Sequence, residues 1–561
     1  MAEKQSGRDP EGERASSDRH HASTLQLNHM NQQSKTALSD ADESQPGPVA
    51  QKQDERYVTG TKLALIMTAL CSTMFLVALD RTIIATAVPR ITAEFHTLKD
   101  ISWYASAYLI TSCATQLLWG RIYTFYSTKT LFLVAIVVFE VGSVVCGAAP
   151  TSTAFIVGRA IAGTGSAGIF SGSTVILTHI VPLQRRPIYV GLMGSMFGIS
   201  SIIGPLIGGA FTDRVTWRWC FYINLPIGAV VLAVLIPFLH VRHQKLESTL
   251  SRQLIRLDPL GTLLFLPAVV CFLLALQWGG TSYPWNSARV IALFVLAGVL
   301  IISFVLVQAW RKEDATTPPR IITQRSIACG ALYAMCVGGG LITMLYSLPL
   351  WFQAVKGTSA VQSGIDTIPL VLGLVAGAII SGGIITATGY YVPWMFVSVV
   401  LMSVGAGLTT TFTVDTGSPA WIGYQALFGL GLGVGLQQPS LAAQTVLPEV
   451  DVSIGISIMF FSQSLGGAVF SSIGQSVFGN FLAQSLARVS GIDVPAVLAA
   501  GAIDLDKVVA AESLAAVLLV YNDSLRKAFI VAVAAAAAMV LPASGMEWRT
   551  IKKGNTNIPA T

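Results

Sequence analysis

Residues 191–228 read GLMGSMFGISSIIGPLIGGAFTDRVTWRWCFYINLPIG, a stretch that indicates a closely packed membrane helix. Glycine recurs through its first half among Met, Phe, Ile and Leu. In a water-soluble helix each such glycine costs roughly 1 kcal/mol relative to alanine. In lipid, the pairs Gly194–Gly198 and Gly204–Gly208 have the small-xxx-small spacing that lets a second helix backbone approach closely. We therefore expect this helix to pack directly against others inside a membrane.

The overall composition is that of a polytopic, all-α membrane protein. Of 561 residues, 53% are hydrophobic and 11% are charged, against about 25% charged in soluble domains. The apolar residues fall in blocks of about 20, the length that crosses ~30 Å of hydrocarbon. All seven cysteines lie in these blocks or at their ends, which argues against a disulfide framework or a metal site. The net charge of +6 is explained by basic loops and requires no nucleic acid.

The apolar blocks predict fourteen membrane spans. An even number places both termini on one side, and the basic residues concentrate in the loops that lie inside if the N-terminus is cytosolic. We therefore expect cytosolic termini. The predicted spans are 62–80, 103–120, 131–149, 154–178, 187–211, 220–240, 259–278, 289–310, 326–352, 365–388, 391–412, 420–446, 453–481 and 525–545.

The loops between spans suggest two six-helix bundles with two helices inserted between them, an arrangement that places a substrate site near the membrane midplane. A long outer loop is expected at about 482–524, and its Asn-Asp-Ser sequon at Asn522 is a candidate glycosylation site. The predicted parts are a disordered cytosolic tail (1–60), an N-terminal bundle (61–240), a segment with a basic linker, two extra spans and an inner loop (241–325), a C-terminal bundle (326–545) and a cytosolic tail (546–561).

Three charged residues fall within or at the ends of spans: Asp80, Glu140 and Arg159. If the hairpin turn centres on Ala149–Pro150, Glu140 and Arg159 lie at similar depth, and Asp80 approaches the same level from span one. Arg159 then has two candidate carboxylate partners. Protonation of a carboxylate beside this arginine can break the pair and bias a two-state bundle. The alternative is a static salt bridge that neutralises a buried charge.

The loop GRIYTFYSTK, residues 120–129, carries Gly120, Arg121 and Lys129, which can hold helix ends and inner-leaflet lipid. An ordinary positive-inside loop is the alternative. Uncharged polar residues inside spans are candidates for the cavity lining, although amides satisfied by neighbouring helices have the same pattern. They are Gln116, Gln277, Gln308, Tyr333, Gln353, Gln437, Gln438 and Gln463. Few charges and abundant Phe, Met, Trp and Gly suit a bulky hydrophobic ligand.

Together these segments resemble the major facilitator superfamily, in its fourteen-span drug:proton antiporter branch, and specifically the fungal efflux pumps of toxins and secondary metabolites. The resemblance covers about residues 60–545. The motifs that carry it are Gly204-Pro205-Leu206-Ile207-Gly208-Gly209 on span five, Leu79-Asp80-Arg81-Thr82-Ile83-Ile84 through Ala87-Val88-Pro89 on span one, and Arg159 with Gly163 and Gly165 on span four.

The resemblance implies proton coupling by Asp80 and Arg159, and a bend favouring export at Gly204 and Pro205, where proline removes one hydrogen bond of the helix ladder. Three positions depart from the family pattern. Ser127 stands in place of a second glycine of the loop motif. Thr124 stands in place of an acidic residue, which weakens the cytosolic latch proposed for the family. Ala162 stands where glutamine is frequent, so no hydrogen bond from that position is carried over.

We therefore expect a proton-coupled efflux transporter of hydrophobic small molecules, monomeric in the plasma membrane, with no cofactor. Its partners are the substrate, protons and the lipid bilayer. No GxxxxGK[ST] motif for ATP is present. The alternatives are a siderophore importer, a vacuolar transporter of basic amino acids, a membrane-embedded enzyme and a sensor. An enzyme needs clustered Asp or His at the membrane face, and the spans contain no such cluster.

Overall fold

The computed structural model describes residues 57–97, 100–241, 256–280, 282–500, 505 and 509–552. These residues are arranged almost entirely in helices, with only two isolated β-bridges among them. Parts of four predicted segments lie outside the described residues: most of the N-terminal tail, the linker residues 242–255, residues 501–504 and 506–508 of the predicted outer loop, and residues 553–561 of the C-terminal tail.

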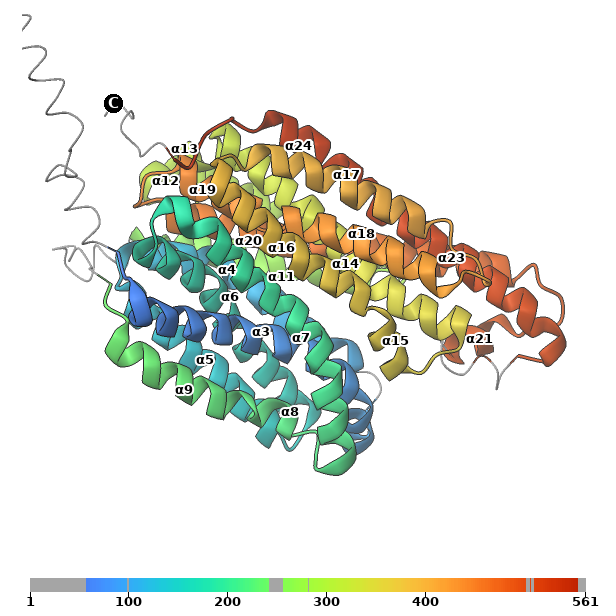
Figure 1. Ribbon diagram of the computed structural model, residues 1–561. Helices are drawn as coiled ribbons and strands as arrows, with labels where there is room; N and C mark the ends of the chain where they lie inside the picture. The colour runs from blue at the N-terminus through green and yellow to red at the C-terminus, as the bar shows by residue number, and fades with distance from the viewer. Residues whose placement is uncertain are drawn as a thin grey trace, which may run out of the picture. The chain divides into compact units, whose positions relative to one another are not determined.

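The first helices form an N-terminal helix group (Figure 1). Helix α6 packs against both α4 and α5, while α3 packs against α7 and α9. The apolar blocks of the sequence therefore become mutually buried helices. The members are α3 (Gly60–Phe95), α4 (Ile101–Phe125), α5 (Thr128–Ala148), α6 (Ser152–Ile180), α7 (Arg186–Arg214), α8 (Trp219–Tyr222) and α9 (Asn224–Phe238).

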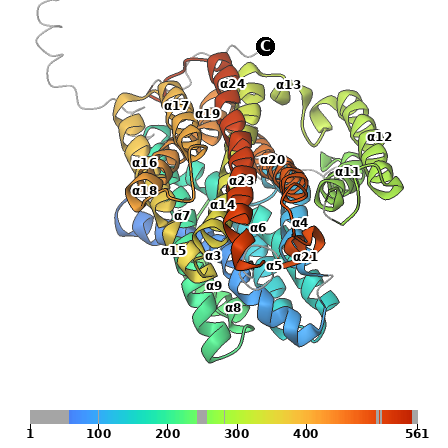
Figure 2. The ribbon, with the colours of Figure 1, turned by 90° about the vertical axis from the view of Figure 1, so that its right-hand side faces the viewer.

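An inserted pair follows, made of α11 (Pro259–Trp278) and α12 (Ala288–Arg311), with a short α13 (Pro319–Ile322) after it. The two long helices pack on each other, and α11 also contacts α4 and α20. Figure 2 shows the pair at the side of the molecule, with α12 outermost. Because α12 has apolar side chains on its exposed faces, it presents a lipid-compatible surface.

The remaining helices form a C-terminal helix group. In it α16 and α17 both pack on α18, while α14 packs on α20 and α23. The members are α14 (Arg325–Lys356), α15 (Ala360–Asp366), α16 (Ile368–Thr388), α17 (Val392–Thr409), α18 (Ser418–Gly435), α19 (Gln438–Val446), α20 (Val452–Leu486), α21 (Val494–Ala500), α23 (Ala511–Ala538) and α24 (Val540–Gly545).

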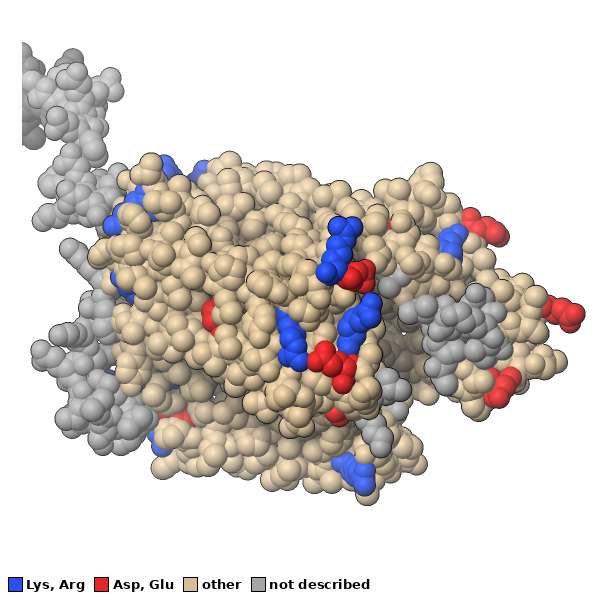
Figure 3. All heavy atoms as spheres, turned by 90° about the horizontal axis from the view of Figure 1, so that it is seen from below, with Lys and Arg blue, Asp and Glu red and all other residues tan. Residues whose placement is uncertain are grey.

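Twelve described helical stretches are long and apolar enough to cross a membrane. The two predicted spans outside this set, 103–120 and 420–446, do form the helices α4 and α18–α19, but these are less apolar. The count of fourteen spans therefore stays a prediction, as does the division into two bundles. On the face drawn in Figure 3, uncharged side chains cover most of the surface, and the charged ones form a group near the middle of the view and smaller patches towards its margins.

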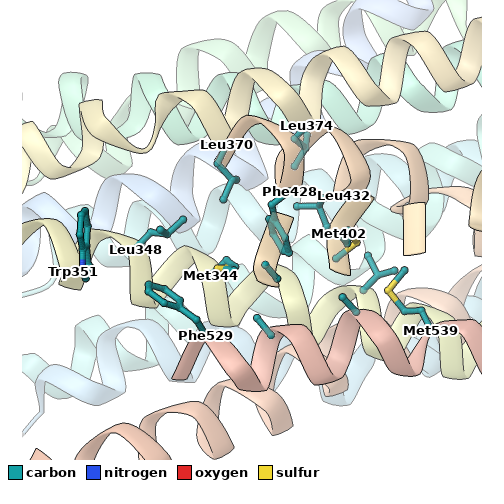
Figure 4. Close-up of a cluster of buried hydrophobic side chains, with 14 of the residues drawn as sticks. Met344, Leu348, Trp351, Leu370, Leu374, Met402, Phe428, Leu432, Phe529 and Met539 are labelled. Carbon is teal, nitrogen blue, oxygen red and sulfur yellow. The ribbon is translucent and has the colours of Figure 1, made fainter. Parts of the chain in front are cut away.

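The core of the C-terminal group explains the position of Asn522. Large apolar side chains from α14, α16, α17, α18 and α23 meet there, including Met344, Phe428 and Phe529 (Figure 4). Asn522 lies on α23 beside this core, where its Oδ1 accepts from Trp351 Nε1 at 2.8 Å and its Nδ2 donates to the Phe412 carbonyl at 3.0 Å.

Two expectations about this region are corrected. Most of the predicted loop 482–524 is helical, because α20 continues to Leu486 and α23 already begins at Ala511. The proposed glycosylation at Asn522 does not fit either. Its amide is buried and both polar atoms of the side chain are bonded within the protein.

Wild-type protein made in a eukaryotic host is therefore expected to carry no glycan at Asn522, as checked by gel mobility after glycosidase treatment. Asn522→Ala leaves the Trp351 donor and the Phe412 acceptor unpaired, so we expect a lower melting temperature, with a cost of about 1–3 kcal/mol. Arg488→Asn, which creates an Asn-Val-Ser sequon on an exposed turn, is the positive control. A glycosidase-sensitive shift in wild-type protein that is lost in Asn522→Gln would contradict the burial argument.

Candidate functional site

A buried ion pair joins α3 and α6. Arg159 Nη1 lies 2.5 Å from Asp80 Oδ2, and the two side chains are 1% and 0% exposed. Arg159 Nε donates to the Tyr104 carbonyl of α4 at 2.9 Å, and its guanidinium lies 4.5 Å from the centroid of the Tyr108 ring. The predicted contact between Asp80 and Arg159 is present in this structure. Removing either charge leaves the other unpaired in a low-dielectric interior, so each residue depends on the other.

Glu140 is not the second partner of Arg159. Close approaches between α5 and α6 bring Gly142 against Ala162 and Phe139 against Gly165. In this register Glu140 lies level with Thr164, more than one turn from Arg159, so the expectation of similar depth was wrong. Its carboxylate points at Gly228 of α9, and neither oxygen has a hydrogen-bond partner among the described residues. Its role in proton coupling stays a prediction without a contact to support it.

The glycines of α7 face two different neighbours. Gly204 and Gly208 lie against the hydroxyls of Thr82 and Thr86 on α3, directly after Asp80 in the sequence. Gly191 lies against the carbonyl of Ala378 on α16, in the other helix group. One helix thus links the element that carries Asp80 to the opposite group. Pro205 lies within α7, whereas Gly209 has open space at its Cβ position.

The loop-motif residues also meet other parts of the chain. Gly120 permits close packing of α4 on Ser457 of α20, and Lys129 Nζ donates to the Ile236 carbonyl at 2.6 Å. Arg121 is buried and donates to the carbonyls of Arg256 at 3.1 Å and Glu313 at 2.9 Å. This loop motif therefore contacts the ends of other helices, while its proposed role as a latch stays a prediction.

Most of the polar cavity candidates are engaged elsewhere. Gln116 bonds Ser171, Gln277 bonds Ser106, Gln308 bonds Asp258, Gln353 bonds Ser363, and Tyr333 donates to the Met395 carbonyl. Gln437 and Gln438 line a small pocket between α7, α16 and α18–α19. Gln463 lies where α20 meets Gly338 of α14. Five of the eight thus tie helices together, as the alternative interpretation held.

Sequence reasoning missed the polar contacts at the end of the molecule where α13 lies. We call this end the α13 end. Ser171 of α6 and Ser457 of α20 lie 3.0 Å apart, and Arg320 of α13 forms a two-pronged pair with Asp451 at 2.5 and 2.9 Å. Hydrogen bonds to Asp451 raise the pKa of Arg320, so this arginine stays charged. A serine in an apolar span and an aspartate in a short loop carry no distinguishing pattern, so only the fold brings them together.

Asp258 is a further buried anchor at the α13 end. It caps α11 by accepting from the Gly261 amide at 2.9 Å, and it also accepts from Gln308 at 2.6 Å and from Thr316 at 3.0 Å. Burial alone raises the pKa of this carboxyl, but these hydrogen bonds outweigh burial and hold the pKa below its usual value. The charged form is thereby maintained where the inserted pair begins.

The sequence profile of the Major Facilitator Superfamily matches residues 70–471. The chain belongs to this superfamily. It is 55% identical over 499 residues to the Rubrofusarin-specific efflux pump aurT of Gibberella zeae, covering 89% of this chain and 92% of the relative. It is 50% identical over 501 residues to Efflux pump aflT of Aspergillus parasiticus, covering 89% and 98%.

Solved structures agree on the fold of this superfamily member. The proton:xylose symporter XylE superposes with a TM-score of 0.55 at 13% identity, covering 86% of this chain and 96% of its own. The human organic anion transporter MFSD10 also gives 0.55 at 13% identity, covering 85% and 100%. At this identity the likeness concerns the fold alone.

Mutation of the buried pair is expected to show strong coupling. Asp80→Asn or Arg159→Gln alone should lower the free energy of unfolding by about 3–5 kcal/mol, because each leaves one buried charge unpaired. The double variant should lose clearly less than the sum. Thermal unfolding in detergent measures this cycle. Asp523→Asn is the matched control, since it breaks only the exposed pair with Arg526 and should cost less than about 1 kcal/mol. Additive losses would contradict the pairing.

The glycines of α7 offer a second comparison on one helix. Gly204→Ala places a methyl group against Thr82 and should cost about 1–3 kcal/mol through overpacking of α3 on α7. Gly209→Ala enters open space and should be neutral or slightly stabilising, because alanine is the better helix former. Melting temperatures of the two purified variants test this difference. Equal effects would mean that α7 does not pack on α3 as described.

Proposed function

We propose that this protein is a proton-driven exporter of hydrophobic small molecules of the secondary-metabolite class, in a fungal plasma membrane. The observation that carries the proposal is the buried Asp80–Arg159 pair in a chain at least half identical to named efflux pumps. Among the described residues Asp80 is the only ion-pair partner of the buried Arg159. Such a carboxylate is a natural site for proton exchange, because protonation removes half of the pair.

Orientation is assigned from charge. The α13 end carries Arg185, Arg256, Lys312, Arg320 and Arg325 in its loops and helix ends, and basic residues favour the cytosolic side. At this end α4 and α6 pack on α20, and the start of α7 packs on α16. Because these contacts join the two helix groups at the proposed cytosolic end, they support the interpretation that the transporter is closed on its cytosolic side.

In the proposed cycle, a proton from the outside neutralises Asp80 and weakens its hold on Arg159. The rearranged pair changes how α3 packs on α7, and α7 in turn changes its packing on α16, which opens the α13 end. Substrate then binds from the cytosolic side as the proton leaves. Movement of one helix group against the other around a fixed site is the general mode of transporters of this type.

Purified protein in proteoliposomes tests the proposal. The probe is the uncharged hydrophobic dye Nile red, and a pH dye is trapped inside the vesicles. Addition of the probe should drive protons in the direction opposite to the probe, whichever way the gradient is imposed. Asp80→Asn should retain probe binding but lose the linked proton movement. Asp523→Asn, which alters an exposed carboxylate, should behave like wild type.

Movement of probe and protons in the same direction would replace export by import. Transport that continues unchanged in Asp80→Asn would remove this carboxylate from the coupling step. A glycan on Arg488→Asn tests orientation independently, because glycosylation requires the end that carries α21 to face outwards.

A further inference from the structure

Arg81 is a second positively charged residue close to the buried Asp80–Arg159 pair, on helix α3, but it is not part of that pair. It follows Asp80 directly, yet none of the carboxylates in the described residues forms an ion pair with it. The carboxylate next to it is already held by Arg159 at 2.5 Å. Glu140 points away towards α9. Arg81 therefore has no ion-pair partner among the described residues, although Asp80 precedes it directly. Such a charge inside a membrane protein is costly and calls for an anion or a function.

The surroundings of Arg81 are aromatic. Its guanidinium lies 5.7 Å from the centroid of the Phe197 ring on α7. Phe197 stacks on Phe170 of α6 with centroids 5.5 Å apart and an interplanar angle of 21°. Phe170 in turn lies 5.7 Å from Phe460 of α20. This aromatic row, Phe197, Phe170 and Phe460, runs from Arg81 across to the C-terminal helix group.

A tyrosine of the C-terminal helix group lies near Arg81. Tyr346 of α14 is close enough to Arg81 for an electrostatic interaction, yet α3 and α14 are not among the helix pairs that pack together. The Tyr346 side chain is 52% exposed. An exposed tyrosine facing an arginine across unpacked helices indicates that both side chains border the space between the two helix groups.

We propose that Arg81 binds the anionic oxygen of a flat aromatic substrate, a phenolate or aryl carboxylate, whose ring packs on the aromatic row and Tyr346. The inference rests on the proposed export function and specifies its substrate class. A guanidinium provides fixed N–H donors for one oxyanion. Offset stacking on Phe and Tyr rings holds the planar body of the ligand. Arg81 thus selects for one negative charge, while the aromatic row accepts many ring systems.

Binding of two matched fluorescent probes to the purified full-length protein tests the proposal. The probes are 7-hydroxycoumarin, at a pH where its hydroxyl is ionised, and its uncharged ether 7-methoxycoumarin at the same pH. Wild type should prefer the anion. Arg81→Gln should weaken anion binding by about tenfold or more, as expected for loss of one charge-assisted hydrogen bond. Its binding of the ether should change by less than about twofold, and Arg81→Lys should retain part of the preference.

Arg289→Gln is the control, because Arg289 also lies over an aromatic ring, that of Tyr283 at 4.9 Å, but at the start of α12 in the inserted pair, outside the two helix groups. It should leave both affinities unchanged. Equal weakening of both probes by Arg81→Gln would make Arg81 a packing residue and overturn the proposal. Absence of any anion preference in wild type would overturn it even if Arg81→Gln failed to fold.

The outcomes also separate this inference from the proposed function. Arg81-dependent anion preference without proton-linked movement in proteoliposomes would leave the binding site intact and remove the exporter mechanism. Proton-linked export of the uncharged dye that is unaffected in Arg81→Gln, together with no anion preference, would leave the exporter mechanism intact and remove the proposed binding site.

Discussion

A single arginine in the interior of the N-terminal helix group constrains the helices around it. An unpaired guanidinium in a low-dielectric interior costs several kcal/mol, so Arg159 requires a carboxylate and further acceptors at fixed positions. Asp80 on α3 supplies the carboxylate, while α4 supplies the Tyr104 carbonyl and the Tyr108 ring. Three helices are thereby held by one side chain, and a change of charge at Asp80 acts on all of them together.

The glycines of α7 extend this constraint to the other helix group. Because they lack a Cβ, Gly204 and Gly208 bring α7 against α3 just beyond Asp80, and Gly191 brings the same helix against a carbonyl of α16. Further hydrogen bonds run between α3 and α7, from Thr82 to the Ser200 carbonyl and from Ser200 to the Phe75 carbonyl. Movement of α3 therefore has a direct mechanical connection to α16.

Sequence reasoning predicted the contact between Asp80 and Arg159 because charges within apolar spans are few and must find partners. It failed for Glu140 because it assumed a symmetric hairpin around Ala149–Pro150. The closest approach instead lies at Gly142 and Ala162, which shifts the register by about five residues, or roughly 7 Å at 1.5 Å per residue. Loop length does not encode this offset, since small residues within the helices decide where two backbones meet.

The sequence alone also did not predict the direction in which each polar side chain faces. Spans that are apolar on all sides give no amphipathic stripe, so Tyr333 and Gln308 could not be distinguished from residues of a cavity. Asn522 was misplaced because the polar residues near it suggested a loop. In the structure, α23 begins eleven residues earlier, at Ala511, and turns Asn522 towards Trp351. Fold type and the rare charges are therefore readable from this sequence, whereas helix rotation depends on neighbours far away in the chain.

The departure at Thr124 has a structural counterpart in the inserted helices. Without an acidic residue at this position, Arg121 donates instead to the carbonyls of Arg256 and Glu313, which flank the inserted pair on either side. Carbonyls do not titrate, so this contact keeps its strength when the pH changes. The α13 end is thus held to α11 and α12 by groups indifferent to protons, and opening it requires the ends of the inserted pair to move with α4. The charge of Asp80 therefore matters most to the packing of the N-terminal helix group, because the arginine it neutralises is buried and has no other carboxylate partner among the described residues.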